Sequence, residues 1–200
     1  SDAMTALSVN AVRGLTTVAV RGLSSDQLAA LTTDQASALR SAQLASLTTG
    51  ALAGLETEDA AVLTSTQVAG LSSAQISVIG TDQLSSLTNS VVRSLSSAQL
   101  RGLSSDQVVA LTTDQAMALS SRQFSWLSTD AIRGFETDDL AVLTSAQLTG
   151  FGTREIRALT SDGVSALAAG ALTGLSSLAM SGLVSDQVAA FTTDQVTGLR

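Results

Sequence analysis

The sequence predicts an all-α superhelical solenoid of very short helices, with one helix in each eight-residue repeat. Three observations predict it. A unit of eight residues recurs 24 times between residues 7 and 198 without an insertion or deletion. Two positions of that unit are apolar, at a spacing of five residues. The positions between them carry the residue types that begin helices.

The repeat is defined by its eight positions, counted from Leu7. Position 1 is Leu in 20 of the 24 repeats and position 6 is apolar in all of them. Position 3 is Ser or Thr in 21 repeats, position 5 is Gln in 13, and position 8 is usually Ala, Gly or Ser. Residues 31–38, which read LTTDQASA, are a typical repeat.

Positions 2 to 6 predict a helix of five to seven residues. The hydroxyl at position 2 is the N-cap, the Gln at position 5 completes a capping box, and the apolar residues at positions 1 and 6 form a hydrophobic staple. A Gly at position 8 is expected to allow positive φ where the helix ends. In four repeats position 2 is Glu or Gly, and the Thr at position 3 is an alternative cap. These exceptions are Glu56, Gly80, Glu136 and Gly152.

Helices this short are unstable alone in water, so the repeats must stack and share a core. One long helix fits poorly, because the apolar residues do not recur at i, i+3 and i+4. A β-solenoid is the alternative fold. It is disfavoured because positions 1 and 6 would point to opposite faces of a strand.

A longer period lies above the repeat. Residues 23–70 match residues 103–150 at 30 of 48 positions, and Gln is missing from position 5 with a rhythm of five repeats. This rhythm predicts about five repeats in each superhelical turn. Arg21 and Arg101 would then alternate down one face with the acidic clusters at residues 56–59 and 136–139. The alternative is solvated charge within a duplicated block.

For domain organisation, residues 1–3 are interpreted as a cloning scar and residues 4–6 as a lead-in. Residues 7–200 are expected to form a single solenoid, made of 24 repeats and the start of a 25th. Solenoids normally end in polar capping repeats, and neither end of this chain resembles one. Exposed core residues at the ends would favour end-to-end self-association.

Composition argues against most kinds of chemistry. The chain has no His and no Cys, which excludes His-based triads, thiolate nucleophiles and zinc–thiolate sites. The net charge of −7 argues against nucleic-acid binding. No apolar run is long enough to span a membrane. We therefore expect no enzyme activity and no cofactor, and the acidic clusters at residues 56–59 and 136–139 leave only a weak cation site as an alternative.

Trp126 is the one candidate for contact with a partner. It occupies position 8, where small residues are the rule. Trp is enriched in binding hot spots, so an exposed Trp126 would serve as an anchor. The alternative is that it covers a local gap in the coil.

The unit LTTDQ, followed by an apolar residue and then a small residue at position 8, resembles the octapeptide arrays of large repetitive bacterial proteins described as adhesion-like. The resemblance extends over residues 7–200 and implies a bacterial origin and a cell-surface or secreted setting. The predicted function is a stiff spacer or scaffold segment in such a protein. The alternatives are a solenoid that binds a protein or glycan on a lateral face, and a surface that binds ice through rows of hydroxyls.

Overall fold

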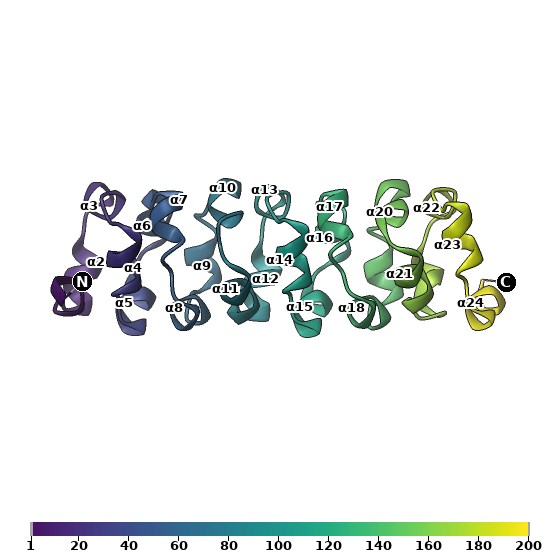
Figure 1. Ribbon diagram of the computed structural model, residues 1–200, viewed down its shortest axis with the longest axis horizontal. Helices are drawn as coiled ribbons and strands as arrows, with labels where there is room; N and C mark the ends of the chain where they lie inside the picture. The colour runs from purple at the N-terminus through teal and green to yellow at the C-terminus, as the bar shows by residue number, and fades with distance from the viewer. Residues whose placement is uncertain (1, 200) are drawn as a thin grey trace. The chain divides into compact units, whose positions relative to one another are not determined.

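The computed structural model describes residues 2–199, and all regular structure in this range is helical. The predicted solenoid of short helices, one for each repeat, is confirmed. The chain divides into two compact units, Ser1–Gly102 and Leu103–Arg200, which are described separately. Within each unit, short helices joined by extended linkers follow one another along the chain (Figure 1). Ser1 of the expected cloning scar and Arg200 of the 25th repeat lie outside the described residues.

The helices are four to six residues long, and none in the described part is long and apolar enough to cross a membrane. The helices of the first unit are α1 (Asp2–Thr5), α2 (Val9–Gly14), α3 (Thr17–Arg21), α4 (Ser25–Ala29), α5 (Thr33–Ala38), α6 (Ser41–Ser46), α7 (Thr49–Leu52), α8 (Thr57–Ala61), α9 (Ser65–Val68), α10 (Ser73–Ile76), α11 (Thr81–Ser86), α12 (Asn89–Ser94) and α13 (Ser97–Leu100). Those of the second are α14 (Ser105–Val109), α15 (Thr113–Ala118), α16 (Ser121–Phe124), α17 (Thr129–Ile132), α18 (Thr137–Ala141), α19 (Ser145–Leu148), α20 (Thr153–Ala158), α21 (Ser161–Ala166), the 3₁₀ helix η1 (Ala171–Gly174), α22 (Ser177–Met180), α23 (Ser185–Ala189) and α24 (Thr193–Gly198).

The helices begin as the capping pattern predicts. In α9, the Gln67 amide donates to the Thr64 hydroxyl at 3.4 Å, and the Thr64 amide donates to Gln67 Oε1 at 2.9 Å. Two repeats with an acidic position 2 keep it as the N-cap, with Glu56 and Glu136 in extended backbone and no bond from their side chains. The same holds where position 2 is glycine, at the starts of α11 and α20. The Thr at position 3 therefore does not replace the cap in any of these four repeats.

Positions 1 and 6 supply most of the core, as predicted, although Val188 and Val196 at position 6 of the last two repeats are about half exposed. Leu44, Leu52 and Ile76 are examples of position 6 that are at most 1% exposed. In the second unit an aromatic cluster replaces part of this aliphatic core. The Phe124 ring lies 5.4 Å from the Phe135 ring and 5.2 Å from the Phe151 ring, between centroids. Helices too short to be stable alone are thus held by a core that they share.

The predicted stacking of each repeat over the fifth is wrong. Each helix packs against the third helix along the chain, as α2 does with α5 and α18 does with α21. Hydrogen bonds between turns join residues 28 to 31 apart, as when Gln43 Nε2 donates to Leu15 O and Val12 O. A turn therefore contains between three and four repeats. The five-repeat rhythm is a pattern of substitutions and does not mark which helices touch.

The expected role of glycine at position 8 is also wrong, because no glycine in the described part has positive φ. Position 8 is instead where one helix approaches the helix three repeats earlier. A Cβ added to Gly102 would lie 2.7 Å from Ser73 O and 3.1 Å from Ser73 Cα. Glycine at such positions permits close contact between backbones.

Candidate functional site

The most regular polar feature of the molecule is the buried Gln at position 5, which joins successive turns. In repeat 63–70, Gln67 Oε1 accepts from the Thr64 amide, which starts its own helix. Gln67 Nε2 donates to Leu39 O at 2.7 Å and to Ala36 O at 3.3 Å, at the end of α5. The same side chain thus satisfies the beginning of one helix and the end of the helix four places earlier.

This bridge recurs in both units. Glutamines whose Nε2 donates to carbonyls 28 to 31 residues earlier include Gln35, Gln43, Gln67, Gln75, Gln83, Gln99, Gln147, Gln187 and Gln195. Nearly all are buried. The sequence analysis assigned the Gln to the capping box alone and missed this second role. A primary amide has two N–H donors, and the capping box uses only its oxygen, so the unused donors were the signal for a second partner.

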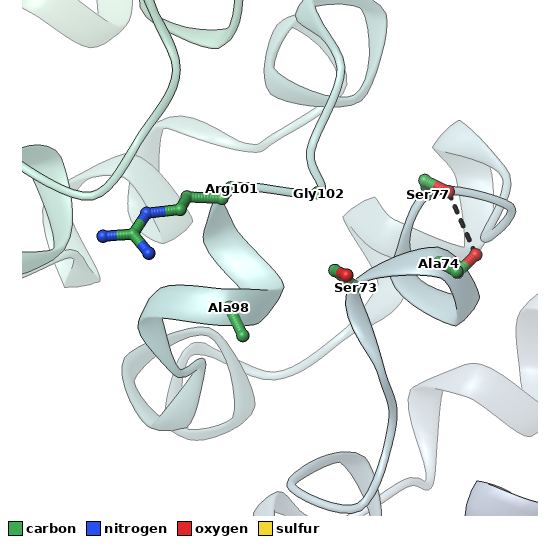
Figure 2. A pocket seen from close by; sticks show the side chains of 6 residues that line it. All are labelled: Ser73, Ala74, Ser77, Ala98, Arg101 and Gly102. Atoms are coloured by element: carbon green, nitrogen blue, oxygen red, sulfur yellow. Dashed lines mark hydrogen bonds between the residues drawn. The ribbon is translucent and has the colours of Figure 1, made fainter.

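The lateral surface carries grooves between helices that pack three places apart. In the first unit such a groove of about 440 Å³ lies between α10 and α13 (Figure 2). Its lining residues occupy positions 3, 4 and 7 of one repeat and positions 4, 7 and 8 of the other. They are Ser73, Ala74, Ser77, Ala98, Arg101 and Gly102. Arg101 is its only charged side chain.

An equivalent groove of about 160 Å³ lies between α17 and α20 in the second unit. Its lining residues fall on the same positions, but three of them are arginines: Thr129, Arg133, Arg154, Arg157 and Ala158. We call this the arginine groove. The Arg133 guanidinium lies 3.1 Å from Asp130, and the Arg154 guanidinium lies 3.2 Å from Glu155. Arg157 makes no ion pair within the described residues, so this groove has an excess of positive charge.

The two acidic clusters place one carboxyl each in the interior. Asp59 and Asp139 occupy position 5, and each is 3% exposed. Burial raises the pKa of Asp59, a hydrogen bond from the Thr33 hydroxyl opposes this, and the charges of Glu56 and Glu58 raise it further. Asp59 Oδ2 has no hydrogen-bond partner within the described residues.

Burial likewise raises the pKa of Asp139. Hydrogen bonds from the Thr113 hydroxyl and from the backbone at Glu136 oppose the increase, and the charges of Glu136 and Asp138 add to it. The two clusters of the duplicated block therefore share one electrostatic arrangement, in which a carboxyl is buried beside two other carboxylates.

The alternative functions considered for the acidic clusters find little support. Within the described residues no group of three or more His, Cys, Asp or Glu side chains is arranged to hold a metal ion. Arg21 lies on α3, which packs against α6, whereas the first acidic cluster lies on α8, which packs against α5 and α11. Arg21 thus does not stack on residues 56–59, because the turn does not contain five repeats.

Trp126 lies half-buried just beyond the end of α16. The Arg122 guanidinium lies 5.3 Å from the centre of its ring, within the range of a cation–π contact. The ring thus presents part of its surface to solvent and part to the molecule. A role as a partner anchor and a role in covering a gap are both compatible with this position, and Trp126 stays a prediction.

A family model described as the ALTTAQ repeat matches the chain five times, at residues 1–33, 20–49, 52–89, 92–121 and 132–169. Together these matches cover more than half of the chain. The chain belongs to the ALTTAQ repeat family. No curated protein matches it.

The letters of the ALTTAQ repeat correspond to positions 8 and 1 to 5 of the unit, as in residues 110–115, which read ALTTDQ. These letters contain the N-cap at position 2 and the bridging Gln at position 5, so they describe the residues that begin a helix and join the turns. Positions 4 and 7 line the grooves. Arg154, at position 4 of this ALTTAQ chain, was not identified in the sequence analysis, although its spacing of three from Arg157 places both on one face of a helix.

Proposed function

We propose that this ALTTAQ chain is a non-enzymatic structural segment, a stiff spacer or scaffold within a larger bacterial surface or secreted protein. The observation that supports it is the set of glutamine bridges, which tie each turn of a unit to the preceding turn. The surface or secreted setting rests on the resemblance to adhesion-like arrays. Composition supports the absence of catalysis and of nucleic-acid binding, because the chain has no His or Cys and has a net charge of −7.

Stiffness would follow from the cost of opening these contacts. Bending a unit separates one turn from the next on one side, which lengthens the bonds from the glutamine Nε2 atoms to the carbonyls they cap. Each buried group left without a partner costs about 1–3 kcal/mol. Bending also exposes core side chains at positions 1 and 6, each worth about 1.5–3 kcal/mol when fully buried. These costs recur in successive turns, so each unit should resist bending along its length.

Distances between pairs of spin labels test this proposal. The chain has no native Cys, so pairs of introduced cysteines are labelled without background. Val18 and Leu178 are 79% and 71% exposed, and labels at Val18→Cys and Leu178→Cys report on the whole chain. A spacer predicts a narrow distance distribution that does not change with ionic strength.

Two control pairs measure the units separately: Val18→Cys with Ser90→Cys in the first, and Val109→Cys with Leu178→Cys in the second. Narrow distributions for both controls and a broad one for the whole-chain pair would mean that two rigid bodies are flexibly tethered, which contradicts the stiff spacer. Broad distributions in the controls would contradict stiffness at the level of the unit.

The second candidate function is binding of a protein or glycan on a lateral face, and it is supported by the grooves and by half-buried Trp126. Substitution of Trp126 by Ala separates the two roles of that residue. Loss of a ligand with unchanged thermal stability would support the anchor, whereas loss of stability alone would support gap filling. An assay for thermal hysteresis would test the third alternative, ice binding. Sedimentation at several concentrations would test end-to-end self-association.

A further inference from the structure

We propose that the arginine groove between α17 and α20 binds a single oxyanion group, which is a sulfate, phosphate or carboxylate. Arg133, Arg154 and Arg157 would supply the charge and the N–H donors, and Thr129 would supply a hydroxyl. This site is independent of the spacer function, so the distance measurements and the binding measurements can fail separately.

Helices packed three places apart form both grooves from equivalent repeat positions, and the residues at those positions decide the charge of each groove. The groove between α10 and α13 has the same repeat positions along its walls, with Ser77 at position 7 of one repeat and Ala98 and Arg101 at positions 4 and 7 of the other. Figure 2 shows Arg101 there, directed away from Ser73 and Ser77. The arginine groove has Arg133, Arg154 and Arg157 at the corresponding positions. No other pair of helices three repeats apart within either described unit has Arg at all three.

Local charge in the arginine groove opposes that of the whole chain. Three guanidinium groups meet two carboxylates, those of Asp130 and Glu155, which leaves one positive charge in a chain of net charge −7. The side chains of Arg133 and Arg154 are 61% and 76% exposed, so a ligand can reach them from solvent. An anion is the ligand that this local charge favours.

The donor geometry favours an oxyanion over a simple halide. A guanidinium group presents paired N–H donors that match two oxygens of a carboxylate, sulfate or phosphate. Arg154 is held in place by Glu155, whose side chain is 6% exposed, and Glu155 also accepts from the Gly152 amide at 3.0 Å. Arg154 and Arg157 are three residues apart on α20 and so share a face, with Arg133 across the groove. The volume of about 160 Å³ suits one such group.

The experiment is a titration of the full chain with inorganic sulfate at low ionic strength, in which NMR detects the arginine Nε–Hε groups. Inorganic sulfate should shift the signals of Arg133, Arg154 and Arg157, with a dissociation constant on the order of 1 mM, and should leave Arg101 unchanged. Equal shifts for all arginines would overturn the proposal, because they would mean general screening. An absence of shifts would overturn it as well.

Substitutions supply matched controls. Arg157→Ala, at an exposed position, should weaken sulfate binding at least tenfold, and Arg157→Lys should weaken it less, because it keeps the charge and loses the paired donors. Arg101→Ala removes the same charge from the other groove and should not change the affinity. Asp130→Asn frees Arg133 and should strengthen binding two- to threefold, an increase that unfolding cannot imitate. Equal losses for Arg157→Ala and Arg101→Ala would overturn the site.

A sulfated polysaccharide and a polyuronate, titrated in parallel, identify the source of the oxyanion. Tighter binding of either polymer than of inorganic sulfate, with shifts at the same three arginines, would assign the groove to an acidic glycan. Equal or weaker binding of both polymers would assign it to a free anion. Polymer binding that survives Arg157→Ala and Arg133→Ala together would overturn the assignment of the groove.

Discussion

Repeats 55–62 and 63–70 are neighbours in the chain and differ in the buried polar residue at position 5 and in its hydrogen bonds. Repeat 63–70 has Gln67 at position 5, which accepts from the Thr64 amide and donates to Leu39 O at 2.7 Å. Repeat 55–62 has Asp59 there, which is equally buried but leaves Oδ2 without a partner within the described residues. The first repeat ends in Val62 and the second in Gly70.

The difference teaches which part of the repeat is required for the fold and which is adjustable. Both repeats form a helix that packs against the helices three places before and after, α5 and α11 for α8, and α6 and α12 for α9. Stacking therefore requires neither the Gln at position 5 nor the Gly at position 8 in every repeat. Position 5 decides how well the polar ends of the helices are satisfied, and whether the repeat responds to pH.

The largest loss of stability is expected from removing a glutamine bridge between turns. Gln67→Ala leaves the Thr64 amide and the carbonyls at the end of α5 without this partner, and buried groups of this kind cost about 1–3 kcal/mol each. We expect the free energy of unfolding to fall by about 3 kcal/mol. Urea denaturation followed by circular dichroism measures the change.

Gln27→Ala is the matched control. Gln27 Oε1 accepts from the Ser24 amide at 3.0 Å, but Gln27 Nε2 donates to no residue in the described part, and the contact is exposed. The loss should be about 1 kcal/mol or less, as for an exposed cap. Equal losses for Gln27→Ala and Gln67→Ala would show that the capping box alone matters and that the bridge between turns contributes nothing.

The next effect concerns position 8. A Cβ on Gly70 would lie 2.9 Å from Ser41 O and 3.3 Å from Ser41 C, so Gly70→Ala must push two backbones apart. Overpacking of this kind costs about 1–3 kcal/mol, and we expect a loss near 2 kcal/mol in urea denaturation. Gly14→Ala is the control, because a Cβ on Gly14 meets nothing within 4 Å. A neutral result for Gly70→Ala would argue against close backbone contact in this repeat.

The third effect is a pH dependence that the acidic repeats should have and the glutamine repeats should lack. The folded state raises the pKa of Asp59 and of Asp139 above 3.8, so it binds more protons than the unfolded state between that value and the raised pKa. Stability should therefore be highest on the acidic side of this window and should fall as pH rises through it. Melting temperatures measured from pH 4 to pH 8 would show the fall.

Asp59→Asn and Asp139→Asn together isolate this effect, since an amide at position 5 cannot ionise. The double variant should lose the fall in melting temperature and should be more stable at neutral pH by about 1–2 kcal/mol, the order expected for relieving two buried carboxylates. An unchanged pH profile would mean that other carboxyls cause it.

Much of the fold followed from the sequence because it depends on local chemistry. The hydroxyl at position 2, the Gln three residues later and the apolar pair at positions 1 and 6 identify a helix start without any knowledge of neighbours. The offset between turns did not follow. The number of repeats in a turn depends on contacts between helices that are distant in the sequence, such as that of Gly102 with Ser73. The five-repeat rhythm of substitutions does not reflect those contacts.

The candidate sites were less predictable for the same reason. Arg133 and Arg157 both occupy position 7 of their repeats, but only the three-repeat offset brings them to one groove with Arg154. The burial of Asp59 also needed the structure, because an acidic cluster in a sequence is ordinarily solvated. Its place at position 5, where Gln is the rule, was the available signal.

The smallest expected change in stability comes from a variant that tests what raises the pKa of Asp59. Glu58→Gln removes one of the two neighbouring charges that raise the pKa of Asp59. It also removes a charge from the first turn of α8 that favours the helix by a few tenths of a kcal/mol. Net stability at neutral pH should therefore change by less than about 0.5 kcal/mol. The fall in melting temperature should nevertheless move to lower pH in an Asp139→Asn background, where Asp59 is the only one of the two buried carboxyls left.

Asp82→Asn in that background is the control for Glu58→Gln. Asp82 lies on α11, which packs against α8, but its charge is not among the causes of the increased pKa of Asp59. Asp82→Asn should leave the transition where it is. If both variants moved the transition equally, the net charge of the surrounding surface would control Asp59. If neither moved it, the charge of Glu58 would have no part in raising the pKa of Asp59, and burial would be the main cause of the increase.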